Sequence, residues 1–82
     1  MADNFLTRLL GRNRPPSEWV AQIFTAQQVL KGGIVRRQVA DVHKYASLDL
    51  LVEEVKRREF HMVQTGNQYV ILCHPGEFKV IC

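Results

Sequence analysis

The sequence predicts a small α+β domain in which two to three helices pack on a three-stranded antiparallel sheet. Three observations predict it. The 82 residues are 46% hydrophobic, which is enough for one small core. Upstream segments place apolar residues at helical spacing. The last part of the chain alternates apolar and polar residues around two turn signals, Gly66-Asn67 and Pro75-Gly76, which is typical of short strands joined by tight turns.

Residues 1–16 are predicted to form a flexible N-terminal arm. Residues 4–11 place four apolar side chains on one helical face, and Gly11 ends that turn. Pro15-Pro16 follows as a linker, because the residue before a proline avoids the helical conformation. The single domain is therefore expected to span residues 17–82.

The first helix of the domain is predicted over residues 17–30. Ser17 is a good N-cap, and the double glycine Gly32-Gly33 should end the helix. Between them, apolar residues recur at near-helical spacing: Trp19, Val20, Ile23, Phe24, Val29 and Leu30.

Residues 34–46 carry two competing patterns. Val35, Val39 and Val42 form a helical stripe, whereas the stretch that starts at Ile34 also reads as a short strand leaving the double glycine. We favour a combination of the two, with a short extra strand at 33–37 and a helix at 38–45.

A further helix is predicted over residues 48–59. Ser47 caps it, Asp49 lies in its first turn, and Lys56 to Arg58 lie in its last turn, where each charge suits the helix dipole. The buried stripe consists of Leu48, Leu51, Val52 and Val55.

The C-terminal strands are predicted at residues 60–65, 69–74 and 78–82, in the order of a meander. With Gly66-Asn67 as a two-residue loop, Val63 faces Val70 and His61 faces Leu72. A three-residue loop would instead exchange the two faces of the first strand. The more apolar face should be the core face; it holds Phe60, Met62, Tyr69, Ile71, Cys73, Phe78, Val80 and Cys82.

The reactive side chains do not combine into a catalytic, cofactor or metal site. Cys73 and His74 are adjacent strand residues and point to opposite faces. Cys73 and Cys82 would lie roughly 13 Å apart along paired strands, too far for a disulfide. The histidines lack the spacing of a metal site, so we expect no enzyme.

Composition also bears on location. No apolar run approaches the roughly 20 residues of a membrane span. Two cysteines without a predicted disulfide favour the cytoplasm.

The first functional hypothesis is a small interaction or adaptor protein that binds an unknown protein partner or forms a homodimer. The predicted outer sheet face is unusually apolar for a solvated surface, and the last strand offers an unpaired edge. The candidate partner-binding residues are Val63, Val70, Leu72, Lys79 and Ile81.

The second hypothesis is nucleic-acid binding. The order helix, short strand, helix, helix, hairpin resembles that of a winged helix-turn-helix domain, with residues 38–59 as the helix-turn-helix and 60–74 as the wing. The resemblance implies that helix 48–59 is the recognition helix and that phosphates are bound by Arg36, Arg37, Arg57 and Arg58. The net charge of +3 is only mildly basic, however. The first part of that helix is acidic, which phosphate would repel.

Overall fold

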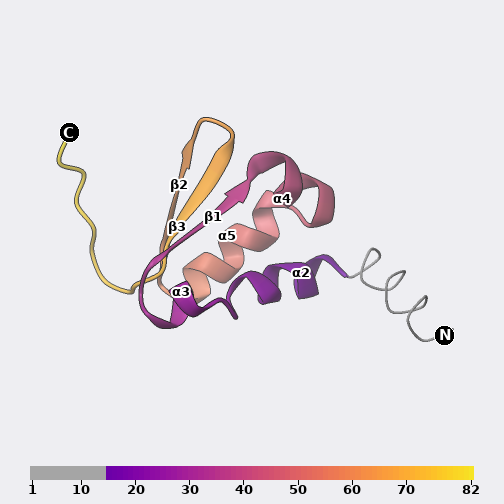
Figure 1. The fold of residues 1–82 in the computed structure, drawn as a ribbon, viewed down its shortest axis with the longest axis horizontal. Helices are drawn as coiled ribbons and strands as arrows, with labels where there is room; N and C mark the ends of the chain where they lie inside the picture. The colour runs from indigo at the N-terminus through magenta and orange to yellow at the C-terminus, as the bar shows by residue number, and fades with distance from the viewer. Residues whose placement is uncertain (1–14) are drawn as a thin grey trace, which may run out of the picture.

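The fold joins four helices to one three-stranded sheet in residues 15–82, the part of the chain that the computed structural model describes (Figure 1). The sheet is antiparallel with the strand order β1-β3-β2, so β3 is central. The predicted α+β class is confirmed, while the predicted N-terminal arm lies almost wholly outside the described residues. In chain order the elements are α2 (Pro16–Ile23), α3 (Gln27–Leu30), β1 (Ile34–Gln38), α4 (Val39–Tyr45), α5 (Leu48–Arg57), β2 (His61–Thr65) and β3 (Gln68–Leu72).

The third strand of the sheet is β1, the short extra strand of the sequence analysis, and not residues 78–82. The prediction of a strand at 78–82 is wrong: the chain after Cys73 forms neither helix nor strand. The reason is competition for one edge of β3. Two hydrogen bonds bracket the β1–β3 pairing, from Cys73 N to Gly33 O at 2.9 Å and from Val39 N to Asn67 O at 2.8 Å. Because β2 pairs along the other edge, β3 has no edge left for a third partner.

The β2–β3 hairpin has the predicted register. Val63 pairs with Val70 and His61 with Leu72 across a two-residue turn. Gly66 in that turn has φ of 59°, a left-handed conformation that glycine adopts without steric cost. The side chains of both strands therefore point to the sheet faces that the sequence predicted for them.

The helix predicted over 17–30 is divided into α2 and α3. Phe24 closes α2 and the chain turns before Gln27. Thr25 Oγ1 donates to Gln22 O at 2.8 Å in that turn. The prediction that Ser17 caps this helix is also wrong, because α2 starts one residue earlier and Ser17 lies inside it. Pro16 occupies the first turn, where the N–H group that proline lacks would have no partner in the helix.

The helices α4 and α5 form close to their predicted positions. Two residues, Ala46 and Ser47, separate them. The Ser47 hydroxyl accepts a hydrogen bond from Leu50 N at 3.1 Å, as expected for an N-cap. Helix α5 ends at Arg57 with Arg58 as its C-cap, and Glu59 follows with φ of 61°. This left-handed residue turns the chain from α5 into β2.

Replacing the cap should therefore weaken the fold measurably. We expect Ser47→Ala to lower the free energy of unfolding by about 1 kcal/mol, because the amide of Leu50 loses its acceptor. Ser17→Ala is the matched control, since Ser17 is exposed and caps nothing; it should change stability by less than about 0.5 kcal/mol. Urea denaturation of both variants measures the difference, and equal losses would contradict the assignment of the cap.

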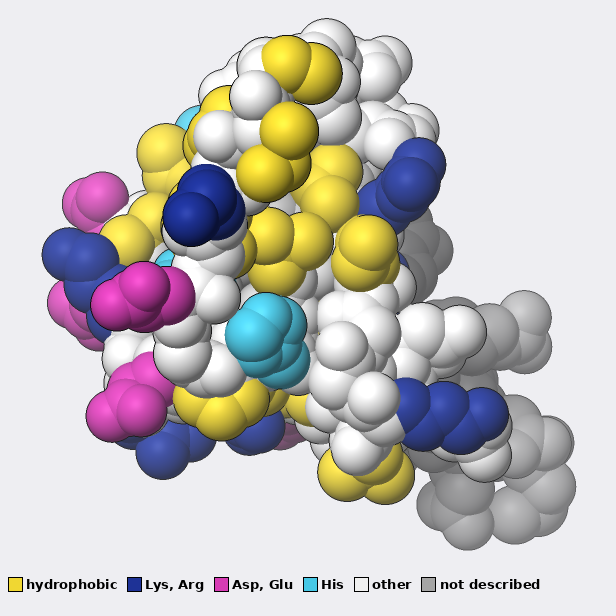
Figure 2. All heavy atoms as spheres, turned by 90° about the vertical axis from the view of Figure 1, so that its left-hand side faces the viewer, with side chains coloured by type: hydrophobic (Ala, Val, Ile, Leu, Met, Phe, Trp, Pro, Cys, Tyr) yellow, Lys and Arg dark blue, Asp and Glu magenta, His cyan; other side chains and the backbone are white. Residues whose placement is uncertain are grey.

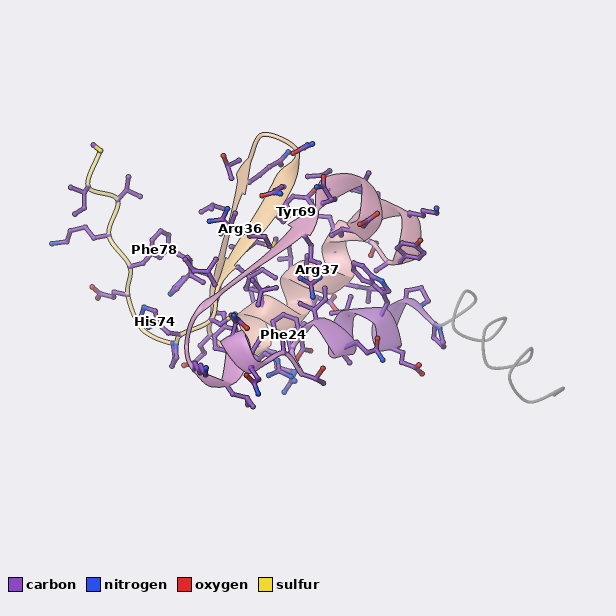
Figure 3. The ribbon with its side chains drawn as sticks, viewed as in Figure 1. Phe24, Arg36, Arg37, Tyr69, His74 and Phe78 are labelled. Atoms are coloured by element: carbon purple, nitrogen blue, oxygen red, sulfur yellow. The ribbon has the colours of Figure 1, made fainter. Side chains whose placement is uncertain are left out.

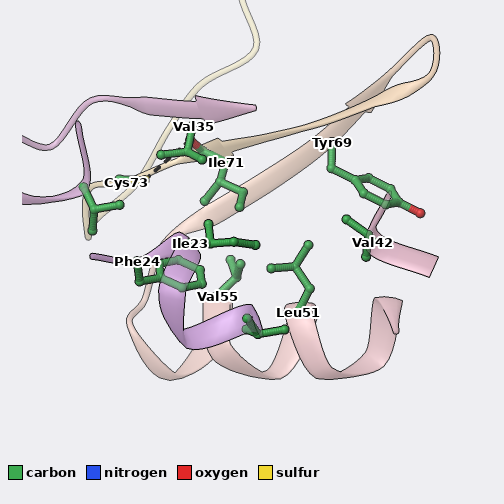
Figure 4. Packing of buried hydrophobic residues seen from close by; sticks show 11 residues of the cluster. Ile23, Phe24, Val35, Val42, Leu51, Val55, Tyr69, Ile71 and Cys73 are labelled. Atoms are coloured by element: carbon green, nitrogen blue, oxygen red, sulfur yellow. Dashed lines mark hydrogen bonds between the residues drawn. The ribbon is translucent and has the colours of Figure 1, made fainter. Parts of the chain in front are cut away.

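The core lies between one face of the sheet and the helices (Figure 4). Ile71 of β3 and Leu51 of α5 are both 0% exposed and lie at its centre. The predicted core positions Tyr69, Ile71 and Cys73 are confirmed, because all three are buried. The prediction is wrong for Phe78, Val80 and Cys82, which are exposed because residues 78–82 do not join the sheet. From β1 only Val35 joins the cluster, since its neighbours Ile34 and Arg36 point to the opposite face. The domain therefore has two layers, and one sheet face receives no helix.

Candidate functional site: the open face of the sheet

The sheet face that points away from the helices is the most distinctive surface of the domain. We call it the open face. Register places three rows across it, each with one residue from β1, β3 and β2. The rows are Ile34–Leu72–His61, Arg36–Val70–Val63 and Gln38–Gln68–Thr65.

Four residues make two adjacent rows of the open face mainly apolar: Ile34, Val63, Val70 and Leu72. Ile34 is 47% and Val63 41% exposed, whereas central Val70 is shielded to 9% by its neighbours. A hollow of about 270 Å³ lies at one end, beside Ile34, Leu72 and His74. In the three rows of this face, only Arg36 and His61 carry ionisable side chains.

The structure brings together three of the five residues predicted to bind a partner. Val63, Val70 and Leu72 share the open face, as expected. Lys79 and Ile81 do not, because their position on this face required a strand at 78–82. Both lie instead in the exposed segment beyond Cys73, where Ile81 is 83% exposed.

Ile34 is a member of the open face that sequence reasoning missed. The ambiguous pattern of residues 34–46 hid it, since a helix and a strand give Ile34 different neighbours. The neighbouring residue Val35 is buried, and strand alternation then places Ile34 on the opposite face. The sequence alone could not show which of the two faces is open, because that depends on how β1 pairs with β3.

Residues 77–82, which we call the tail, extend away from the sheet, and Phe78 lies at the start of this segment (Figure 3). The His61 ring lies 4.6 Å from the Phe78 ring between centroids, and its Nε2 donates a hydrogen bond to Gly76 O. These contacts hold only the start of the tail. Beyond Phe78 the side chains stand in solvent, with Val80 75% exposed. Figure 2 shows hydrophobic side chains gathered on the side of the molecule from which the tail projects.

The basic residues of the nucleic-acid hypothesis do not form one patch. Arg57 donates to both carboxylate oxygens of Glu54, at 3.1 and 2.5 Å, and Arg58 donates to the same group at 2.6 Å. Arg58 also lies over the Phe24 ring, 4.6 Å from its centroid. Both guanidinium groups therefore already have partners within the domain.

Arg36 and Arg37 differ from that pair in having no ion-pair partner within residues 15–82. Consecutive strand residues point to opposite faces, so Arg36 lies on the open face and Arg37 on the helical side (Figure 3). The Arg37 Nη1 reaches around the strand edge and donates to Arg36 O at 2.7 Å. The two charges thus flank the free edge of β1.

The remaining reactive groups assemble no chemical site in the described region. No group of three metal-ligating side chains occurs within residues 15–82. Cys73 is buried and Cys82 exposed, and both are free thiols. Burial raises the pKa of the Cys73 thiol, which disfavours the thiolate that a nucleophile needs. His43 Nε2 and the Tyr69 hydroxyl form a hydrogen bond at 3.1 Å that joins α4 to the sheet.

The Glu54 cluster should give a pH-dependent contribution to stability. Hydrogen bonds from Arg57 and Arg58 hold the pKa of Glu54 below its ordinary value, against the opposing effect of burial. The contribution is therefore present above the ordinary carboxyl pKa and is lost as the pH falls through the lowered one.

We expect Glu54→Gln to cost less than about 1 kcal/mol at neutral pH, and the cost to vanish in strong acid. Glu53→Gln is the control, because Glu53 forms no ion pair with an arginine among the described residues. Urea denaturation at both pH values measures the cost, and a pH-independent loss would contradict this role.

Three comparisons place the chain in no known group: no family model, no curated protein and no solved structure matches it. Within the described residues, none of the helices has the length and apolar character needed to cross a membrane.

Proposed function

We propose that this domain is a small interaction module that binds a protein surface through the open face of its sheet. The observation that carries the proposal is the exposure of Ile34 and Val63 on a sheet face that no helix covers. A solvated sheet face is usually polar, whereas two of the three rows of this one are mainly apolar, with Arg36 and His61 as their polar members. Covering such a face with an apolar partner surface removes it from water, which favours association.

The experiment compares Val63→Asp with Leu30→Asp. Both substitutions place a carboxylate on an exposed apolar position, but Leu30 is 81% exposed in α3 and lies off the open face. Proteins captured by the wild-type chain from an extract of its own cells are identified, and each candidate is purified and titrated. Self-association is measured in parallel by sedimentation velocity.

We expect Val63→Asp to weaken binding at least tenfold, which corresponds to about 1.4 kcal/mol. Leu30→Asp should leave the affinity within about twofold. A complex whose affinity is insensitive to Val63→Asp would contradict binding through the open face. Circular dichroism of both variants checks that each one folds.

A second function, nucleic-acid binding, is favoured by the element order. Helix, strand, two helices and a hairpin follow one another as the winged-helix resemblance implies. The charges oppose it, because Asp49 and Glu53 lie within the first six residues of α5, and Arg57 and Arg58 are bound to Glu54.

Fluorescence anisotropy with labelled random duplex DNA and single-stranded RNA at low salt tests this second function. We expect no saturable binding. Binding that falls steeply with salt and is lost in Arg36→Ala and Arg37→Ala would instead support the winged-helix hypothesis, because phosphate contacts release counterions.

A further inference from the structure

We propose that a second copy of this chain adds its tail, residues 77–82, to the free edge of β1, and that the two copies exchange tails reciprocally. The proposal goes beyond the proposed function, because it names a second copy as the partner and the edge of the sheet, not its open face, as the contact. It unites two features that the isolated domain leaves unused: an exposed strand-like segment and an open sheet edge.

The outer edge of β1 has no neighbouring strand and is flanked by Arg36 and Arg37. Because Gly33, Val35, Arg37 and Val39 face β3 in the ladder, the N–H and C=O groups of Ile34 and Arg36 point outward. No backbone group within residues 15–82 pairs with them, and only the Arg37 side chain touches Arg36 O. No proline or lysine lies in this strand. Such an edge is a template for another strand.

A groove runs beside this edge. It encloses about 400 Å³ and is lined by Ala26, Gln28, Ile34, Val35, Arg36 and Arg37. The edge of β2 is less suitable, because its start is tied to α5 through a bond from Phe60 N to Val55 O and is flanked by Phe78. The free edge of β1 is therefore the better acceptor of a strand.

The tail has the composition and length of a strand. Its sequence, Glu-Phe-Lys-Val-Ile-Cys, is rich in aromatic and β-branched residues and lacks glycine and proline. Six extended residues span about 20 Å, enough to run along the five residues of β1. Within the described part of its own subunit, the tail is held through Phe78, which is itself 44% exposed.

One antiparallel register satisfies both the apolar and the charged residues. Pairing Val80 with Ile34 places Phe78 opposite Arg36 and Glu77 opposite Arg37. Val80 then extends the apolar part of the open face. The Glu77 carboxylate reaches the Arg37 guanidinium, which has no carboxylate partner in the described part of its own subunit. When the tail pairs with the partner's β1, Phe78 loses its contact with His61 of its own subunit.

The test is a charge-reversal cycle followed by sedimentation equilibrium under reducing conditions. We expect a reversible wild-type dimer. Glu77→Arg and Arg37→Glu should each raise the dimer dissociation constant at least tenfold, and the double variant should return it to within about threefold of wild type. Lys56→Glu makes a comparable charge change on an exposed position of α5 and should leave the constant unchanged.

Two further measurements locate the contact. Deleting residues 77–82 should abolish the dimer, while the thermal unfolding midpoint stays almost unchanged when it is measured at concentrations where the wild-type chain is monomeric. Because Cys82 is exposed and Cys73 is buried, donor and acceptor dyes can be placed on Cys82 alone. A mixture of donor-labelled and acceptor-labelled chains should then show energy transfer, and adding excess unlabelled chain should reduce it.

A wild-type chain that stays monomeric, a dimer that survives the deletion, or a double variant as weak as the single ones would each overturn the exchange. The proposed function fails separately. Val63 lies two strands away from the β1 edge, so Val63→Asp should leave an exchange dimer intact. A dimer dissolved by Val63→Asp but not by the deletion would support the open face and overturn the exchange.

Discussion

Leu51→Ala should destabilise the domain by about 3 kcal/mol, within the 2–5 kcal/mol typical of buried leucines. Leu51 is 0% exposed in α5 and belongs to the cluster that joins this helix to the sheet. Removing its side chain loses apolar burial and leaves a cavity, since neighbours relax only partly. A domain of this size has a total stability on the order of 5–10 kcal/mol, so the variant should be close to unfolding at elevated temperature.

The matched control for this prediction is Leu30→Ala. The chemical change is identical, but Leu30 is 81% exposed, so the loss should stay below about 0.5 kcal/mol. Urea denaturation of both variants gives the two values, provided that the slopes with denaturant agree. Similar losses in the two variants would show that the helix packing described above is wrong.

Val35→Asp should destabilise the domain by more than about 3 kcal/mol. Val35 is 5% exposed, pairs with Ile71 and is the member of β1 that reaches the core. A carboxylate there loses its water without gaining a hydrogen-bonding partner. Ile34→Asp changes the adjacent residue, which is 47% exposed on the open face, and should cost far less.

The same prediction distinguishes the two candidates for the third strand. Val80→Asp lies in the segment that the sequence pattern predicted as a strand, yet Val80 is 75% exposed. We expect it to change stability by less than about 0.5 kcal/mol. If Val80→Asp unfolded the domain while Val35→Asp did not, the sheet would be the predicted meander and not the β1-β3-β2 sheet. Thermal and urea unfolding of the three aspartate variants provide the measurement.

Part of the candidate site was predictable because it depends on local geometry. The Gly66-Asn67 turn sets the register of the β2–β3 hairpin, and strand alternation then places Val63, Val70 and Leu72 together. Local geometry did not predict that Ile34 belongs to the open face, or that Lys79 and Ile81 do not. They depend on which distant segment pairs with β3.

The first helix shows a similar limit. Apolar residues continue at helical spacing from Trp19 to Leu30, so the pattern predicts one helix. In the fold, α2 ends at Ile23 and the chain turns, after which Val29 of α3 is again buried. The spacing of apolar residues is therefore the same for one continuous helix as for two helices whose connecting turn lets both contact the same core.

The sequence by itself determined the α+β class, the helix capped by Ser47, the hairpin register and the opposite directions of Cys73 and His74. Each of these follows from interactions between residues a few positions apart, which helical and strand periods describe. Only the tertiary structure decided that β1 occupies the remaining edge of β3 and that the tail is left in solvent. Residues 34–38 and 78–82 both have strand-like sequences, but only one edge of β3 was available. Pairing of residues 34–38 buries Val35 against the helices, and this long-range contact is not encoded in any local pattern.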